Sequence, residues 1–415
     1  MTQRTCTTTS PKTDGANATS RNAPHKSGRV RSIETQLRKF DVSVRREARR
    51  LVRSHARIAE LALSFPGLLH HLAMLTRDER APNGRAQRLL EQVIDGRPMK
   101  DIAALAGCPM WMRRLPPEAF CRLHGRLPTS DRFQRAIQAR LPVKRASSAR
   151  WLEAVSFANE AAGEAFALWT AERAEMLPPD LPAERTLRVL AAYTLASRRL
   201  ERGAGKLVRT PWHPVIGNTG MICGAMSWLK RIDLMVTRSG LAAEPWLLPD
   251  IQHGFSFEPL SSAEDLVSEA LTMRNCLDHY AQQLNAGACQ LFAVRRGGTS
   301  IATLEIMPHA KECHAYSISQ IKGRANAAVS DDVWKAAYAW LASQPSLMVR
   351  ERIPAPPRYD TKVWDELFQP LGLVGRTDAG ALWWPQRISA REMSLLLHDL
   401  AQLAKSAMVR SWQFR

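Results

Sequence analysis

The feature that most constrains the fold is a glycine pair, Gly297–Gly298, that separates two runs of strand-forming residues. Two adjacent glycines permit the positive backbone angles that a two-residue hairpin turn requires. The run before the pair, Gln290–Arg296, is apolar on both faces, as a covered strand must be. In the run after it, Thr299–Met307, successive side chains point to opposite faces of the strand, so Thr303 and Glu305 share one face. The sequence therefore predicts an antiparallel hairpin.

The residues around this hairpin extend it to a small module. Ser261, followed by Glu264, is a capping-box signature that predicts a helix start. A third strand is predicted at about His314–Ile321, and a helix over Asp331–Ala342. Phe255–Phe257 alternates like a short strand before the module. We expect a helix, a three-stranded antiparallel meander and a helix, which is a compact α+β arrangement.

The rest of the chain divides by composition. A chain of 415 residues is long for one core, so more than one domain is expected. Residues 1–32 are rich in Thr, Ser, Asn, Lys and Arg, and predict a disordered basic tail. Residues 33–248 show helical periodicity, 249–345 hold the α+β module, and 346–415 predict a C-terminal helical tail. The fold class is therefore α+β, with a mostly helical N-terminal region.

A large positive charge points to a polyanionic partner. The formal net charge is +19, and nucleic acid is the commonest partner of such chains. Gln36–Leu63 predicts one amphipathic helix with a basic face. Its arginines either contact phosphates or lie in water on a helix docked against its own domain. The candidate nucleic-acid contacts are Arg45, Arg46, Arg49, Arg50 and Arg53.

Two further features could read nucleic acid, but a structural role is favoured for both. Gly96–Leu115 has the spacing of a first helix and turn of a helix-turn-helix, and then Cys108–Pro109 and Arg113 break the pattern. We predict a plain helical segment there. Trp111 and Trp151 flank a second basic block and could stack on bases. Tryptophan at helical spacing is more often core, so we expect both to be buried.

Cysteine usage and hydropathy indicate the compartment. The chain has seven cysteines, an odd number without the close pairing of a disulfide framework. The first residues contain no apolar run, and no stretch approaches the length of about 20 apolar residues that a membrane span needs. We expect a cytoplasmic protein without a signal peptide or membrane span. We also expect no cofactor.

The environment of Cys276 depends on where the helix beginning near Ser261 ends. If the helix continues, Cys276 joins a buried stripe with Met273, Leu277, Tyr280 and Leu284. If it breaks near Thr272, Asn275 caps a second helix and Cys276 lies in its first turn. The free amide groups there favour a thiolate. The sequence leaves both alternatives open.

The module resembles the PcfJ-like proteins of conjugative plasmids and related mobile elements. The matching pattern is Met273, Cys276, Tyr280, Gly287, Arg295, Ala302, Thr303, Glu305, Gln320, Gly323 and Asn326. Many family members have a histidine immediately before the cysteine, where this chain has Asn275; His279 follows three residues beyond Cys276. The resemblance implies a link to conjugation or mobile elements, and proteins of the conjugation apparatus as partners. It implies no particular reaction.

The polar residues admit four interpretations. In a cysteine-dependent enzyme, Cys276 would be the nucleophile, and Glu305 or Asn326 would orient the base. Gln320 would donate a hydrogen bond to the oxyanion or the substrate. The base would be His279 or His314. In a metal site, Cys276 and His279 would need further ligands, and these have irregular spacing, so we expect no metal. The irregularly spaced candidates are Cys289, His309, Cys313 and His314.

The interpretation we favour is a binding module without covalent chemistry. Its polar set recognises a ligand, with nucleic acid as the leading class. A structural scaffold is the remaining alternative. We therefore expect a nucleic-acid-associated binding protein linked to conjugation or mobile elements. The predicted ligand-binding residues are Arg295, Thr303, Gln320, Lys322 and Asn326, together with Glu305.

Overall fold

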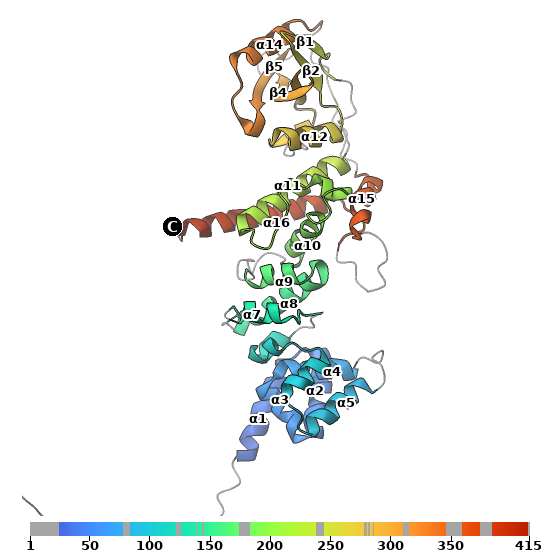
Figure 1. Cartoon of the computed structure of the whole chain (residues 1–415), viewed down its shortest axis with the longest axis vertical. Helices are drawn as coiled ribbons and strands as arrows, with labels where there is room; N and C mark the ends of the chain where they lie inside the picture. The colour runs from blue at the N-terminus through green and yellow to red at the C-terminus, as the bar shows by residue number, and fades with distance from the viewer. Residues whose placement is uncertain are drawn as a thin grey trace, which may run out of the picture. The chain divides into compact units, whose positions relative to one another are not determined.

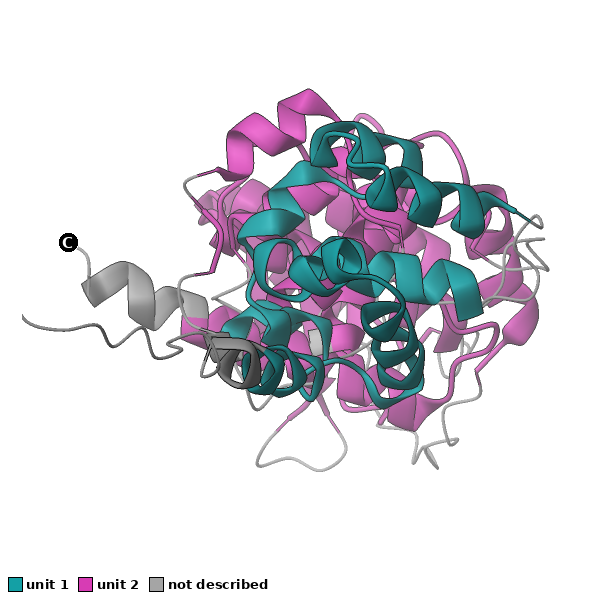
Figure 2. Cartoon of the chain, turned by 90° about the horizontal axis from the view of Figure 1, so that it is seen from below, with its two compact units in different colours: residues 1–123, 143–149 teal, residues 124–142, 150–415 magenta. Residues whose placement is uncertain are grey.

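The chain folds into two compact units, coloured separately in Figure 2. One unit comprises Met1–Leu123 and Val143–Ala149, and the other His124–Pro142 and Arg150–Arg415. None of the helices in the described ranges is long and apolar enough to cross a membrane. The computed structural model describes residues 25–77, 84–121, 126–138, 140–142, 145–173, 183–237, 245–277, 280, 283–284, 286–309, 315–345, 359–373 and 384–413.

The first unit is helical. Buried residues from successive helices form its core, among them Val44, Leu51, Leu61, Leu68 and Phe120. Its elements are α1 (His25–Leu37), α2 (Val42–Ser54), α3 (Ala56–Ser64), α4 (Pro66–Arg77), α5 (Arg85–Ile94), α6 (Met99–Ala106) and two short 3₁₀ helices, η1 (Met110–Arg114) and η2 (Pro117–Phe120).

The N-terminal part of this unit corrects two predictions. The disordered tail was predicted to reach residue 32, but α1 begins at His25, because Ile33 and Leu37 bury one face of it. Residues 1–24 lie outside the described part of the chain. The predicted single helix over Gln36–Leu63 is also wrong. Asp41 caps α2 by accepting from the Ser43 amide over 2.8 Å, and extended backbone at His55 separates α2 from α3.

The segment with partial helix-turn-helix spacing contains no second α-helix. α6 ends at Ala106, its C-cap Gly107 has a φ of 73°, and the short 3₁₀ helix η1 follows Pro109. Trp111 in η1 is buried, and Trp151 is buried with its indole N–H donating to the Ala171 carbonyl over 2.9 Å. The predictions of a plain helical segment and of two core tryptophans are confirmed.

The second unit contains a helical part and a sheet. The C-terminal helices lie against α11 (Figure 1), and Trp364 and Trp384 stack with ring centroids 5.8 Å apart in that core. The helices here are α7 (Asp131–Ile137), α8 (Arg145–Ala162, entering this unit at Arg150), α9 (Glu164–Ala171), α10 (Ala183–Ala196), η4 (Gly203–Leu207), α11 (Asn218–Thr237), α15 (Thr361–Phe368), η7 (Gln369–Leu371) and α16 (Ala390–Gln413).

The sheet has five antiparallel strands in sequential order, so the α+β class is confirmed and the predicted number of three strands is wrong. Two additional strands precede the meander. The second of them joins the sheet by pairing Phe257 with Val294, a residue from which a helix separates it in the sequence. Gly297 and Gly298 have φ values of 55° and 78°, as the hairpin turn requires. The strands are β1 (Asp250–Gln252), β2 (Phe255–Pro259), β3 (Gln290–Arg296), β4 (Thr299–Pro308) and β5 (Tyr316–Gly323).

Helices cover both faces of this sheet (Figure 1). On one face α14 (Asp331–Ala342) places Trp340 against Phe257 and Phe292, with ring centroids 4.8 and 4.9 Å apart. On the other face α12 (Ala263–Met273) packs Leu266 and other apolar residues against Leu291 and Ala293. α12 covers only part of this second face of the sheet. The remaining part carries the polar residues described next.

Candidate ligand-binding site

The site begins where α12 ends. The N-cap of α12 is Ser262 with Asp265 in a reciprocal capping box, one residue later than the predicted Ser261 and Glu264. The helix stops at Met273, and Arg274 adopts a left-handed conformation with a φ of 51°. The alternative of an unbroken helix with a buried cysteine stripe is therefore wrong. Cys276 lies beyond the break and is exposed.

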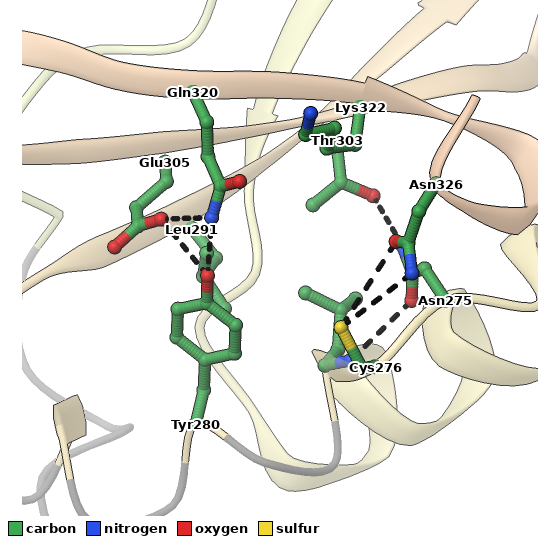
Figure 3. A pocket seen from close by; sticks show the side chains of 10 residues that line it. Asn275, Cys276, Tyr280, Leu291, Thr303, Glu305, Gln320, Lys322 and Asn326 are labelled. Atoms are coloured by element: carbon green, nitrogen blue, oxygen red, sulfur yellow. Dashed lines mark hydrogen bonds between the residues drawn. The ribbon is translucent and has the colours of Figure 1, made fainter. Parts of the chain in front are cut away.

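A second sharp segment faces the break. The short η6 (Arg324–Asn326) follows β5, and both Ala325 and Asn326 have positive φ values, 56° and 62°. Non-glycine residues rarely adopt this conformation, and such residues cluster at functional sites. The geometry places the Asn326 amide beside Cys276, with the sulfur 3.7 Å from Nδ2 and 4.0 Å from Oδ1 (Figure 3).

The sheet supplies the opposite wall. Strand register pairs Glu305 with Gln320 and Thr303 with Lys322, so these four side chains share one face. Glu305 is only 7% exposed, and its Oε2 accepts hydrogen bonds from the Tyr280 hydroxyl over 2.8 Å and from Gln320 Nε2 over 2.5 Å. Gln320 Nε2 also donates to the Tyr280 oxygen over 2.6 Å. Desolvation, followed by the Glu305 carboxylate, raises the pKa of Tyr280, so the phenol stays protonated at neutral pH.

Asn275 joins the two walls. Its Nδ2 donates to the Thr303 hydroxyl oxygen over 2.9 Å, and its Oδ1 accepts from the Leu277 amide at 3.5 Å. Asn275 is 6% exposed, so both ends of its amide are satisfied inside the protein. Asn275 therefore fixes the loop that carries Cys276.

These groups line a cavity of about 240 Å³ (Figure 3). Polar atoms from the loop after α12, from β4, from β5 and from η6 converge on it. Two apolar side chains, Leu277 and Leu291, complete the lining. The full lining is Asn275, Cys276, Leu277, Tyr280, Leu291, Thr303, Glu305, Gln320, Lys322 and Asn326.

Comparison with known proteins identifies the part of the chain that holds this cavity. Residues 246–336 match the family of PcfJ-like proteins. The predicted resemblance is confirmed over that segment, which runs from the residues before β1 into α14. No curated protein and no solved structure matches the chain. We call residues 246–336 the PcfJ-like module.

Most of the predicted site residues of the PcfJ-like module come together at the cavity. Cys276, Glu305 and four of the predicted ligand-binding residues line it: Thr303, Gln320, Lys322 and Asn326. The sequence predicted Asn275 only as a helix cap under one alternative, and Tyr280 in a buried stripe under the other. The signal for Tyr280 was its place in the family pattern, four residues after the cysteine.

Arg295 does not line the cavity. Its Nε donates to Glu258 over 2.8 Å, and its Nη2 lies 3.6 Å from Glu269 of α12. Ser300 also donates to Glu269 over 2.8 Å. Burial raises the pKa of Glu269, which is 3% exposed. The arginine predicted to contact a ligand instead ties α12 to the sheet.

Several candidates for cysteine or metal chemistry cannot be placed. His279, Cys313 and His314 lie outside the described residues. The described residues hold no group of three or more His, Cys, Asp and Glu side chains suited to a metal ion. Cys289 is buried, and burial raises the pKa of its thiol to about 12. Among the described cysteines of the PcfJ-like module, Cys276 is the one that lines the cavity.

The predicted basic face on α2 is partly engaged within its own unit. Arg49 Nε donates to Glu34 over 3.0 Å, Arg50 Nε to Glu47 over 2.9 Å, and Arg45 to the Phe40 carbonyl over 2.7 Å. Arg46 and Arg53 are exposed, and no described residue forms a hydrogen bond or ion pair with either. These two guanidinium groups are the members of the predicted set best able to contact an external anion.

Proposed function

We propose that the chain is a nucleic-acid-associated binding protein, and that the cavity of its PcfJ-like module is the ligand site. One observation carries this proposal. Polar side chains from four separate segments converge on one cavity, and hydrogen bonds among themselves hold them in place. A site whose polar groups are already ordered loses little entropy on binding, which favours recognition.

The backbone around the cavity supports binding over a purely structural role. Left-handed backbone at a non-glycine residue costs on the order of 1 kcal/mol, and Arg274, Ala325 and Asn326 all adopt it beside the cavity. A scaffold would gain more stability from relaxed turns and from apolar side chains that fill the cavity. Strain of this kind is retained where it positions side chains for a ligand.

Charge supports nucleic acid as the ligand class. The net charge of +19 attracts polyanions, and Arg46, Arg53 and Lys322 present exposed cations. The family resemblance adds the setting, because PcfJ-like proteins belong to conjugative plasmids and mobile elements. We therefore place the protein's partners among nucleic acids and the proteins of a conjugation apparatus.

Fluorescence anisotropy with labelled single-stranded DNA and RNA tests the proposal on the full chain. We expect binding that weakens steeply with salt, since each neutralised phosphate releases counterions. Arg46→Gln with Arg53→Gln should weaken binding and reduce the salt slope by about 1 for each phosphate that the variant no longer neutralises. Arg391→Gln, which removes an exposed arginine from α16, is the matched control. Binding that does not change with salt would contradict the proposal.

A cysteine-dependent enzyme is the second candidate, and one observation favours it. The break after Met273 leaves Cys276 exposed at the cavity wall rather than buried in a helix. The test is the iodoacetamide rate of Cys276 against pH, with the exposed Cys121 of the other unit as an internal reference. A rate that is already maximal at pH 7 supports nucleophilic chemistry. A rate that follows Cys121 across the pH range rejects it.

A further inference from the structure

We infer that the cavity of the PcfJ-like module binds one nucleotide with an amino-bearing base, placing the base inside and the phosphate on Lys322. The inference rests on the proposed function and specifies its ligand. The free nucleotide and an unpaired nucleotide within a strand share this chemistry. The size of the cavity and the polar atoms that remain available in it both select such a ligand.

The size of the cavity limits the ligand to one small group. At about 240 Å³ it falls below the range of about 300–1,000 Å³ typical of pockets for drug-sized ligands. A single ring system fits this scale, whereas a folded peptide or several stacked bases do not. Leu277 and Leu291 provide apolar contact for the ring faces.

Gln320 presents a hydrogen-bond acceptor to the cavity. Its Nε2 donates to both Glu305 and the Tyr280 oxygen, and a carboxylate can only accept. The opposite amide orientation would set the Gln320 oxygen against the Glu305 oxygen, so the orientation is fixed. Gln320 Oε1 is then the atom left for a ligand, and Figure 3 shows it on the side of Thr303. It requires an N–H donor.

Thr303 adds a hydroxyl to the same wall, and Figure 3 shows that hydroxyl turned towards Asn275. Its oxygen accepts the Asn275 amide over 2.9 Å, and no described residue accepts its hydroxyl hydrogen. A ligand that satisfies the Gln320 oxygen needs an N–H donor. The exocyclic amino group of adenine or cytosine offers that donor. A buried polar atom left unpaired by the wrong ligand would lower its affinity.

Lys322 supplies the charge for the phosphate. It is exposed and pairs in register with Thr303, so its ammonium group lies on the same face of the sheet. The Glu305 oxygen nearest the cavity is already taken up by Tyr280 and Gln320. Lys322 is the cation among the lining residues, and ammonium groups bind phosphate as point charges.

Protection of Cys276 from alkylation tests the inference on the full chain. Peptide mass spectrometry follows iodoacetamide labelling of Cys276, with the exposed Cys121 as an internal control. Saturating adenosine or cytidine 5′-monophosphate should slow labelling of Cys276 at least tenfold and leave Cys121 unchanged. Purine riboside 5′-monophosphate has no N–H donor on its base, so it should bind about tenfold more weakly than adenosine 5′-monophosphate. Equal protection by inorganic phosphate alone would overturn the role of the base.

Variants and calorimetry provide a second readout that is independent of the thiol. Lys322→Met should weaken adenosine 5′-monophosphate about tenfold and leave adenosine nearly unchanged. Gln320→Met should weaken both. Lys335→Met, on α14 over the opposite face of the sheet, is the matched control and should change neither. Oligonucleotide binding that protects Cys276, without any effect of mononucleotides on its labelling, overturns this inference and leaves the proposed function standing. Absence of both kinds of binding overturns both.

Discussion

Replacing Tyr280 with phenylalanine removes one hydroxyl that serves two hydrogen bonds of the cavity wall. The hydroxyl donates to Glu305 over 2.8 Å and accepts from Gln320 over 2.6 Å. A hydrogen bond to a charged group contributes about 1.5–3 kcal/mol. Tyr280 is partly buried and Gln320 continues to donate to Glu305, so we expect the lower part of that range. The PcfJ-like module should lose about 1.5–2 kcal/mol of stability.

Hydrogen exchange of the β4 and β5 amide groups measures this loss, because it reports the stability of one part of a larger chain. Tyr338→Phe is the matched control. Tyr338 is exposed on α14, so its hydroxyl should contribute no more than about 0.5 kcal/mol. A double-mutant cycle with Glu305→Gln isolates the pair, and we expect a coupling energy of about 1 kcal/mol or more. A coupling energy near zero would refute the hydrogen-bonded wall.

Three other changes test the surroundings of the cavity. Arg274→Gly removes left-handed strain and should stabilise α12 by about 1 kcal/mol in hydrogen exchange; destabilisation would contradict the strain argument. Burial raises the folded-state pKa of Glu269 above 4.5, so its contribution to stability is present below pH 4.5 and is lost as pH rises through the folded-state pKa. The melting temperature should therefore fall over that pH range, and Glu269→Gln should abolish the fall. A melting-temperature profile that this substitution leaves unchanged would contradict the role of Glu269. Arg295→Met should destabilise the module by about 1–2 kcal/mol in the same exchange assay, because Glu258 and Glu269 lose their cation. No change would show that the ion pairs are dispensable.

Local pattern predicted the centre of the module well. β3 has the predicted bounds, Gln290–Arg296, and α14 spans the predicted Asp331–Ala342. Thr303 and Glu305 share a face because side chains alternate along a strand, whatever the rest of the fold. The family pattern included both Cys276 and Asn326, which are distant in sequence, and the structure places them side by side.

Contacts between distant residues could not be read in the same way. β2 joins the sheet through pairing with β3, and no local signal encodes that partner. Arg295 and Arg49 both read as exposed cations, but each meets a carboxylate that only the fold brings near, Glu258 or Glu34. The capping box lies one residue later than predicted because Ser261 and Ser262 can both cap a helix.

The most direct test of the ligand site is the alkylation rate of Cys276 in the full chain with a saturating single-stranded oligonucleotide, measured against Cys121 in the same sample. If nucleic acid occupies the cavity, labelling of Cys276 should slow at least tenfold, because the thiol lines it, while Cys121 keeps its rate. Full occupancy of the protein by the oligonucleotide with an unchanged Cys276 rate would contradict the account, because binding would then occur away from the PcfJ-like cavity.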